Sequence, residues 1–146
     1  MTGSKIAAPV AGFASISLPG RKQALSKVDD FVARYAAAWN EADAERRKAA
    51  VSEVWAEDGV YANSSEEYRG HEQIEKAVRE AYDDFIAKGF AFTVHEHREH
   101  HGCVRIVWHM VPQGGGDAAA IGTEFIVLDD SGRARTDHQF IEMSPA

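Results

Sequence analysis

The C-terminal part of the chain holds the side chain best suited to acid–base chemistry at neutral pH. His138 lies in an alternating segment, and an imidazole has an ordinary pKa of about 6.5. In a strand, His138 shares a face with Phe140, while Asp137 shares the other face with Arg133 and Arg135. Because arginines belong in water, we expect His138 rather than Asp137 to face the interior and to move a proton.

A second histidine group lies in residues 94–101. His95 and His97 are two residues apart, so on a strand they face the same way and could chelate zinc or nickel. Their spacing matches no specific metal motif, and the interleaved Glu96, Arg98 and Glu99 are typical of a solvated strand end. We therefore predict no functional metal here.

These residues must be positioned by helices that precede a run of strands. Apolar steps of three and four predict a helix from residue 26 to about residue 40, a second one capped by Asp43, and a third from residue 70 to residue 88. Alternation and turn residues then predict strands at 60–63, 66–69, 90–101, 103–111, 118–128 and 133–143. This order indicates an α+β fold.

Strand periodicity leaves one face assignment open. Residues 103–111 have a clear apolar face that includes Trp108 and Met110, whereas residues 118–128 could turn either face inward. One face carries Thr123 and Phe125, and the other carries Glu124. A sheet covered by helices on one side could enclose a cavity or a filled core between the aromatic side chains of Tyr35, Trp39, Trp55, Trp108 and Phe125.

Composition narrows the class of protein. The chain has 146 residues, a formal net charge of −7 and one cysteine, and 45% of its residues are hydrophobic. This length predicts a single domain, placed at 25–146 after a flexible arm at 1–24. The acidic balance argues against a nucleic-acid partner, and no apolar run is long enough to span a bilayer, so we expect a cytoplasmic protein. No glycine-rich phosphate loop follows a strand, so no cofactor is predicted.

Three motifs in order resemble a known family. Residues 34–40, 54–61 and 68–74, followed by the strands, resemble the nuclear-transport-factor-2-like superfamily, in its SnoaL-like branch of polyketide cyclases and ketosteroid isomerases. The resemblance implies a cone-shaped α+β barrel, in which a curved antiparallel sheet wraps around three helices with a pocket at the wide end. It also implies a homodimer that pairs through the sheet.

The resemblance assigns roles to particular residues. Tyr35 matches the hydrogen-bond donor of the isomerases, and Thr123 stands where their second donor, a protonated aspartate, is expected. Asn63 occupies the place of their general base, and an amide cannot take up a proton near neutral pH. The resemblance points Asp137 inward, against the strand parity that favours His138. Steroid-isomerase chemistry as such is therefore not expected.

Together these observations predict a protein with a small-molecule pocket, and they leave two hypotheses for its function. One is a cofactor-independent acid–base enzyme of isomerase, cyclase, dehydratase or hydrolase type, with Tyr35, Asn63 and either His138 or Asp137 in the chemistry. The other is a non-catalytic ligand-binding or dimeric scaffold module. The ligand is expected to be small and apolar or polycyclic, held by Trp39, Trp55, Trp108, Met110, Thr123, Phe125 and Phe140.

Overall fold

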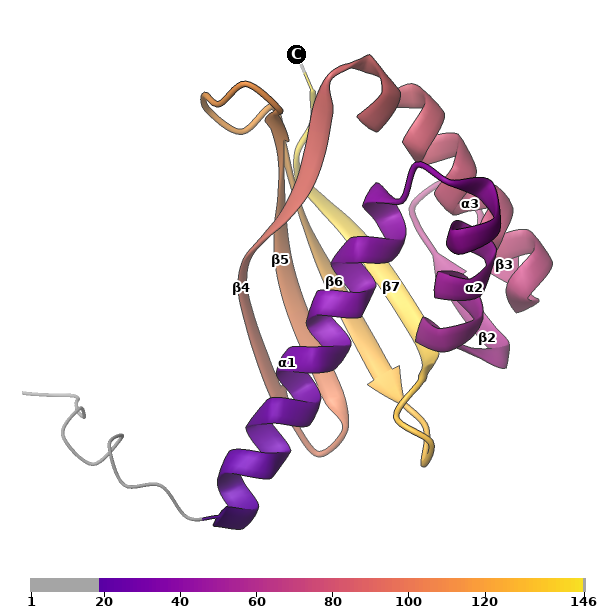
Figure 1. The fold of residues 1–146 in the computed structure, drawn as a ribbon, viewed down its shortest axis with the longest axis vertical. Helices are drawn as coiled ribbons and strands as arrows, with labels where there is room; N and C mark the ends of the chain where they lie inside the picture. The colour runs from indigo at the N-terminus through magenta and orange to yellow at the C-terminus, as the bar shows by residue number, and fades with distance from the viewer. Residues whose placement is uncertain (1–18, 146) are drawn as a thin grey trace, which may run out of the picture.

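A computed structural model describes residues 19–145, which form three α-helices, a short 3-10 helix and one sheet, with β2 and β3 between the second and third α-helices (Figure 1). The elements are α1 (Pro19–Asn40), α2 (Ala44–Val54), β2 (Trp55–Ala62), β3 (Glu67–Arg69), α3 (Gly70–Asp84), the short 3-10 helix η2 (Ile86–Lys88), β4 (Phe90–His100), β5 (Cys103–Pro112), β6 (Ala120–Leu128) and β7 (Ala134–Met143). The predicted α+β class is confirmed.

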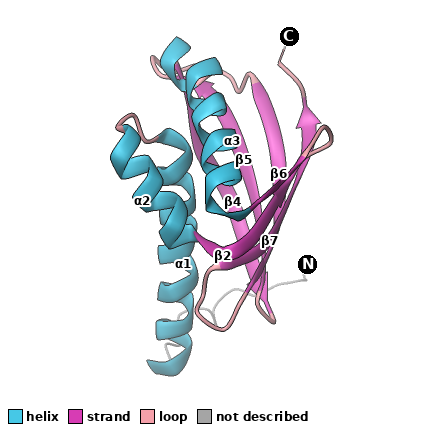
Figure 2. Ribbon diagram, turned by 90° about the vertical axis from the view of Figure 1, so that its right-hand side faces the viewer, coloured by secondary structure: helices cyan, strands magenta, loops and turns pink. Residues whose placement is uncertain are grey.

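The six strands form a single curved sheet in the order β3-β2-β7-β6-β5-β4. All neighbouring pairs are antiparallel except β2 and β7, which are parallel, so the sheet is mixed rather than antiparallel throughout. Its two edges, β3 and β4, do not pair with each other, so the sheet remains open and is not a closed barrel. Figure 2 shows the three helices together on one face of the curved sheet.

The core lies between the helices and the inner face of the sheet. Asp43 caps α2 as predicted, since its side chain accepts a hydrogen bond from the backbone N–H of Arg46 at 2.9 Å. The hydrophobic cluster at its centre draws buried residues from every layer, among them Val32, Tyr35, Ala38, Val51, Val54, Trp55, Tyr61, Ile74, Val78, Val104, Ile106, Ile126 and Ala134. This burial supplies the main stabilisation of the fold.

The first helix begins earlier than predicted. α1 starts at Pro19, not at residue 26, so residues 19–24 of the predicted arm belong to the helix. A proline suits a first helical turn because its missing N–H would have no partner there. Residues 1–18 lie outside the described residues, and the prediction for that part of the arm stays a prediction.

An extra residue in β7 reverses the parity expected from the sequence. Val127 pairs with Thr136 and Leu128 pairs with Ala134, which leaves Arg135 as a bulge. Ala134 and Asp137 are therefore both fully buried although they are three residues apart, while Arg135 is exposed.

Gly122 makes room for a large ring on the neighbouring strand. Gly122 lies opposite Trp108 in the ladder between β5 and β6. A Cβ atom at position 122 would collide with Cζ2 and Cε2 of the Trp108 indole. A glycine inside a strand commonly marks such a close approach.

We expect Gly122→Ala to destabilise the protein by about 1–3 kcal/mol, because the indole must shift within a packed interior. Urea unfolding would measure this loss. The matched control is Gly114→Ala, since a Cβ there meets nothing within 4 Å. Equal stability of the two variants would contradict the proposed steric role of Gly122.

Candidate functional site

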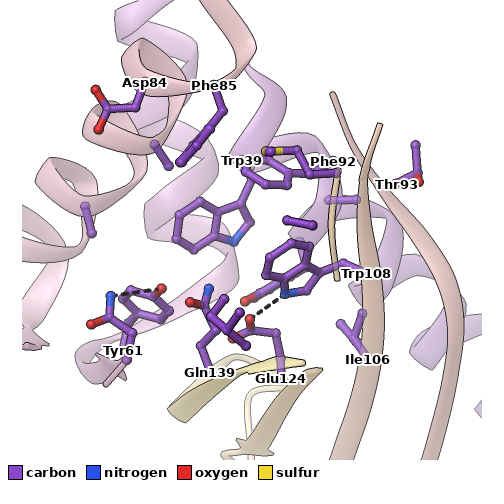
Figure 3. Close-up of a pocket in the computed structure, with 18 of the residues that line it drawn as sticks. Trp39, Tyr61, Asp84, Phe85, Phe92, Thr93, Ile106, Trp108, Glu124 and Gln139 are labelled. Atoms are coloured by element: carbon purple, nitrogen blue, oxygen red, sulfur yellow. Dashed lines mark hydrogen bonds between the residues drawn. The ribbon is translucent and has the colours of Figure 1, made fainter. Parts of the chain in front are cut away.

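A cavity of about 290 Å³ lies between α1, α3 and the inner face of the sheet. Its wall is mostly aromatic and aliphatic, and Figure 3 shows the side chains of Trp39, Phe85, Phe92 and Trp108 around it. This volume is at the small end of the range for ligand sites, so it suits a small molecule. Polar groups lie among these apolar side chains. They are the side chains of Tyr35, Tyr61, Asn63, Tyr68, Glu80, Asp84, Thr93, Trp108, Glu124 and Gln139, with the indole of Trp39.

Two carboxyl groups are buried together on neighbouring strands beside this cavity. Glu124 on β6 lines the cavity and is 1% exposed, while Asp137 on β7 is fully buried behind it. The Arg135 bulge turns Asp137 inward, and strand alternation from Gly122 turns Glu124 inward. The two residues are diagonal neighbours in the ladder between β6 and β7, since Glu124 pairs with Gln139 and Ile126 pairs with Asp137, and each affects the pKa of the other.

Each carboxyl group is held by one strong donor. The Tyr35 hydroxyl donates to Oδ2 of Asp137 at 2.8 Å, and Nε1–H of Trp108 donates to Oε2 of Glu124 at 2.8 Å (Figure 3 shows the second bond). The other oxygens, Oε1 of Glu124 and Oδ1 of Asp137, are buried without a donor. Because ionised carboxylates only accept hydrogen bonds, a proton held between the two groups is what would satisfy these oxygens.

The directions of the pKa shifts of Asp137 and Glu124 agree with one proton retained by the pair. Burial raises the pKa of Asp137 well above its ordinary value, and the nearby charge of Glu124 raises it further. Burial also raises the pKa of Glu124, although the neighbouring Asp137 and the hydrogen bond from Trp108 oppose the rise. The pair titrates as a unit, with one group protonated and one ionised over a range that begins above the ordinary carboxyl pKa.

The Tyr35 hydroxyl is a hydrogen-bond donor here and not a base. Burial and the neighbouring carboxyl groups raise its pKa well above 10.0, so the phenol keeps its proton. Its hydroxyl therefore stabilises negative charge on the carboxyl pair.

Asn63 lies at the cavity and also fixes the turn between β2 and β3. Its Oδ1 accepts hydrogen bonds from the backbone N–H groups of Ser65 and Glu66 at 2.9 and 3.0 Å. Its Nδ2 donates to the Tyr61 hydroxyl oxygen at 3.4 Å. The amide thus has a turn-forming role that an Asx turn explains.

Comparison with known protein families shows the family to which this chain belongs. A profile of the SnoaL-like domain matches residues 32–135, which include Tyr35, Trp108 and Glu124 and end just before Asp137 on β7. The chain belongs to the SnoaL-like family.

Solved structures share this fold. A candidate isomerase of the SnoaL-like family from Agrobacterium tumefaciens has a TM-score of 0.72 and 28% identity, over 80% of this chain and 98% of that one. A candidate polyketide cyclase from Sinorhizobium meliloti has a TM-score of 0.61 and 17% identity, over 78% and 98%. A protein with a ketosteroid isomerase-like fold from Catenulispora acidiphila, in complex with trimethylamine, has a TM-score of 0.56 and 17% identity, over 75% and 83%.

A search of curated proteins gave no match to this SnoaL-like chain. Within residues 19–145, none of the helices combines the length and apolar character needed to cross a bilayer.

The structure of this SnoaL-like domain brings five of the predicted site residues together. Tyr35, Trp39, Asn63, Trp108 and Met110 all line the cavity. Trp55, also predicted to line it, is fully buried in the core behind Tyr35 and Trp39, with ring centroids 5.5 and 6.0 Å from theirs.

Four predicted site residues lie on the opposite face of the sheet. β6 turns Glu124 inward, so Thr123 and Phe125 on either side of it face outward. Phe140 and His138 face the same way on β7, where they pair with Thr123 and Phe125. The sequence did not decide the inner face of β6 because its outward face is as apolar as its inward one.

The prediction that His138 faces the pocket was wrong. Asp137, not His138, points to the inner side of the sheet. His138 is exposed and Asp137 is fully buried. The parity argument failed because it assumed a regular strand from Arg133 onward, whereas the bulge at Arg135 places Asp137 on the inner face while Arg135 stays exposed.

The expected common orientation of His95 and His97 was also wrong. The ladder between β4 and β5 shifts register at His95, whose ring stacks on His109 with centroids 4.3 Å apart. His97 instead contacts Asp29 of α1, at 3.0 Å from Nε2 to Oδ1. Among the described residues, no group of three or more His, Cys, Asp or Glu side chains is placed to hold a metal ion.

Glu124 and Gln139 are cavity residues that sequence reasoning missed. Gly122 could have indicated Glu124, because a strand glycine opposite a tryptophan marks the face on which the ring packs. Once Glu124 is inward, its pairing with Gln139 places that residue inward as well.

The carboxyl pair predicts a pH-dependent stability. Between the ordinary pKa of an aspartate, 3.8, and the raised pKa of Asp137, the folded chain binds more protons than the unfolded chain. The free energy of unfolding should therefore fall as pH rises through this window, by up to about 1.4 kcal/mol per pH unit for one proton.

Asp137→Asn should reduce this slope, because an amide keeps the hydrogen bond from Tyr35 but does not titrate. Urea unfolding at several pH values from 5 to 9 measures it. Asp130→Asn, on the exposed loop before β7, is the control and should keep the slope of the natural chain. Identical slopes in all three proteins would contradict a proton retained at Asp137.

Proposed function

We propose that this chain is an acid–base enzyme of isomerase or cyclase type, which moves a proton within a small and mostly apolar substrate. The observation that carries the proposal is the buried carboxyl pair beside the aromatic cavity. Glu124 lines the cavity and would exchange the proton with the substrate. Raised carboxyl pKa values bring such groups toward the neutral range in which proton transfer is efficient.

In this proposal the ionised Glu124 takes a proton from a carbon or oxygen of the substrate and returns it at another position. Asp137 is a positioning residue that acts through Glu124, because it does not reach the cavity itself. The Tyr35 and Trp108 donors offset the change of charge on the pair during transfer. Asn63 is not the base, so the basic group of this chain lies on β6 instead of the β2–β3 turn.

Hydrogen exchange tests this proposal without knowledge of the substrate. Incorporation of solvent deuterium next to the carbonyl of small cyclic ketones, such as cyclohexanone and 2-cyclohexen-1-one, can be followed by NMR. We expect catalysis by the natural chain and a loss of about 10²–10⁴-fold in Glu124→Gln, since the amide cannot accept the proton. Glu53→Gln, exposed on α2, is the control and should exchange as the natural chain does.

The alternative is a SnoaL-like module that binds a ligand without transforming it. Asn63 favours this alternative, because its amide oxygen is engaged in a turn. Ketones that bind, as judged from tryptophan fluorescence, but exchange no faster than in buffer would establish it and overturn the enzyme proposal.

We also propose that two copies of the chain pair through the outer face of the sheet. Phe125 and Phe140 are 41% and 54% exposed there and pack edge to face, with ring centroids 5.7 Å apart. Such exposed apolar side chains gathered on one sheet face are typical of an interaction surface.

Phe140→Asp should convert a dimer into a monomer in light scattering coupled to size exclusion, because a charge cannot be buried unpaired at an apolar interface. Circular dichroism should stay unchanged, since Phe140 is exposed in the single chain. Ala87→Asp, exposed on η2, serves as the control. A natural chain that is monomeric at micromolar concentrations would refute pairing through this face.

A further inference from the structure

The charges around the cavity all have one sign. Glu80 and Asp84 of α3 line its rim, and Glu124 lines its interior. Among the described residues that line it, none is lysine, arginine or histidine. The buried Arg47 does not compensate, because it contacts Glu75, at 3.6 Å from Nε to Oε2, and lies over the Tyr82 ring. The cavity therefore disfavours anionic ligands and favours cations.

The aromatic wall is suited to a cation as well as to an apolar ligand. Phe92 meets Trp39 at 76° and Trp108 at 82°, and Tyr61 meets Trp39 at 63°. Rings at these angles bound the cavity from different directions instead of forming one flat stack. Ring faces carry negative charge density and attract ammonium groups, most strongly where water is excluded.

The negative charge that such a cation needs is already in place. Glu124 lines the cavity, and the carboxyl pair keeps one negative charge in its singly protonated form. A positively charged group in the cavity would offset this charge. It would also favour the ionised form of Glu124, the form that accepts a proton.

We propose that the ligand of this cavity carries a small alkylammonium group, held among Trp39, Phe92 and Trp108 and close to Glu124. This proposal rests on the proposed function in one respect, because it takes the cavity beside Glu124 to be the ligand site and names the class of ligand that binds there. It does not require that the chain be an enzyme.

Three probes of matched size and different charge test the proposal. They are choline, its uncharged carbon analogue 3,3-dimethylbutan-1-ol, and the anionic 3,3-dimethylbutanoate. Binding is measured by the change in tryptophan fluorescence, since Trp39 and Trp108 line the cavity, and is repeated by calorimetry. We expect choline to bind about tenfold or more tightly than the alcohol, and the anion to bind most weakly.

Glu124→Gln should remove most of the preference for choline over the alcohol, because the amide keeps the shape and loses the charge. Glu80→Gln and Asp84→Asn at the exposed rim should leave the fold intact and reduce choline binding by about two- to threefold each, as expected for screened charges. These rim variants keep the test decisive if Glu124→Gln fails to fold.

Two sets of results would overturn the proposal. If the alcohol or the anion binds as tightly as choline, the ligand class is wrong, while ketone exchange at Glu124 can still support the proposed enzyme. If no probe binds at millimolar concentration, the ammonium site is refuted. The proposed enzyme is overturned separately, by ketones that exchange no faster than in buffer.

Discussion

Two carboxyl groups buried side by side constrain this molecule more than any other feature. Glu124 and Asp137 lie on adjacent strands with almost no exposure. Full ionisation of both would place two like charges in an interior that hydrates neither of them. A single proton shared by the pair relieves this repulsion and satisfies oxygens that otherwise lack a donor. The surrounding structure is arranged to hold the pair in that state.

Each layer of the fold contributes one part of this arrangement. α1 supplies the Tyr35 hydroxyl, β5 supplies the Trp108 indole, and the bulge in β7 turns Asp137 toward the helices. Gly122 admits the indole that holds Glu124. The same indole forms part of the cavity wall, so the group that fixes the acid also shapes the ligand site. In the proposed enzyme, stability and chemistry are therefore coupled through Trp108.

Much of the fold follows from local patterns, whereas the site depends on irregular positions. The sequence predicted the order of the main helices and strands and the cavity residues Tyr35 and Trp39, because apolar periodicity and turn residues specify them, but it placed the starts of α1 and β2 too late. It missed the direction of Asp137, since a bulge at an exposed arginine leaves no apolar pattern. It left β6 unresolved because both faces of that strand are apolar, and the outer face carries Phe125 where the proposed partner copy would bind. Pairing with neighbouring strands, not local residue preference, determines which faces of β6 and β7 point toward the helices.

The most direct test is a pH titration of the carboxyl carbons of Glu124 and Asp137 by 13C NMR in protein labelled at aspartate and glutamate. The account predicts that the pair releases its last proton well above the ordinary carboxyl pKa, and that the two resonances titrate together. Two carboxyl groups that are both fully ionised at pH 5 would contradict it.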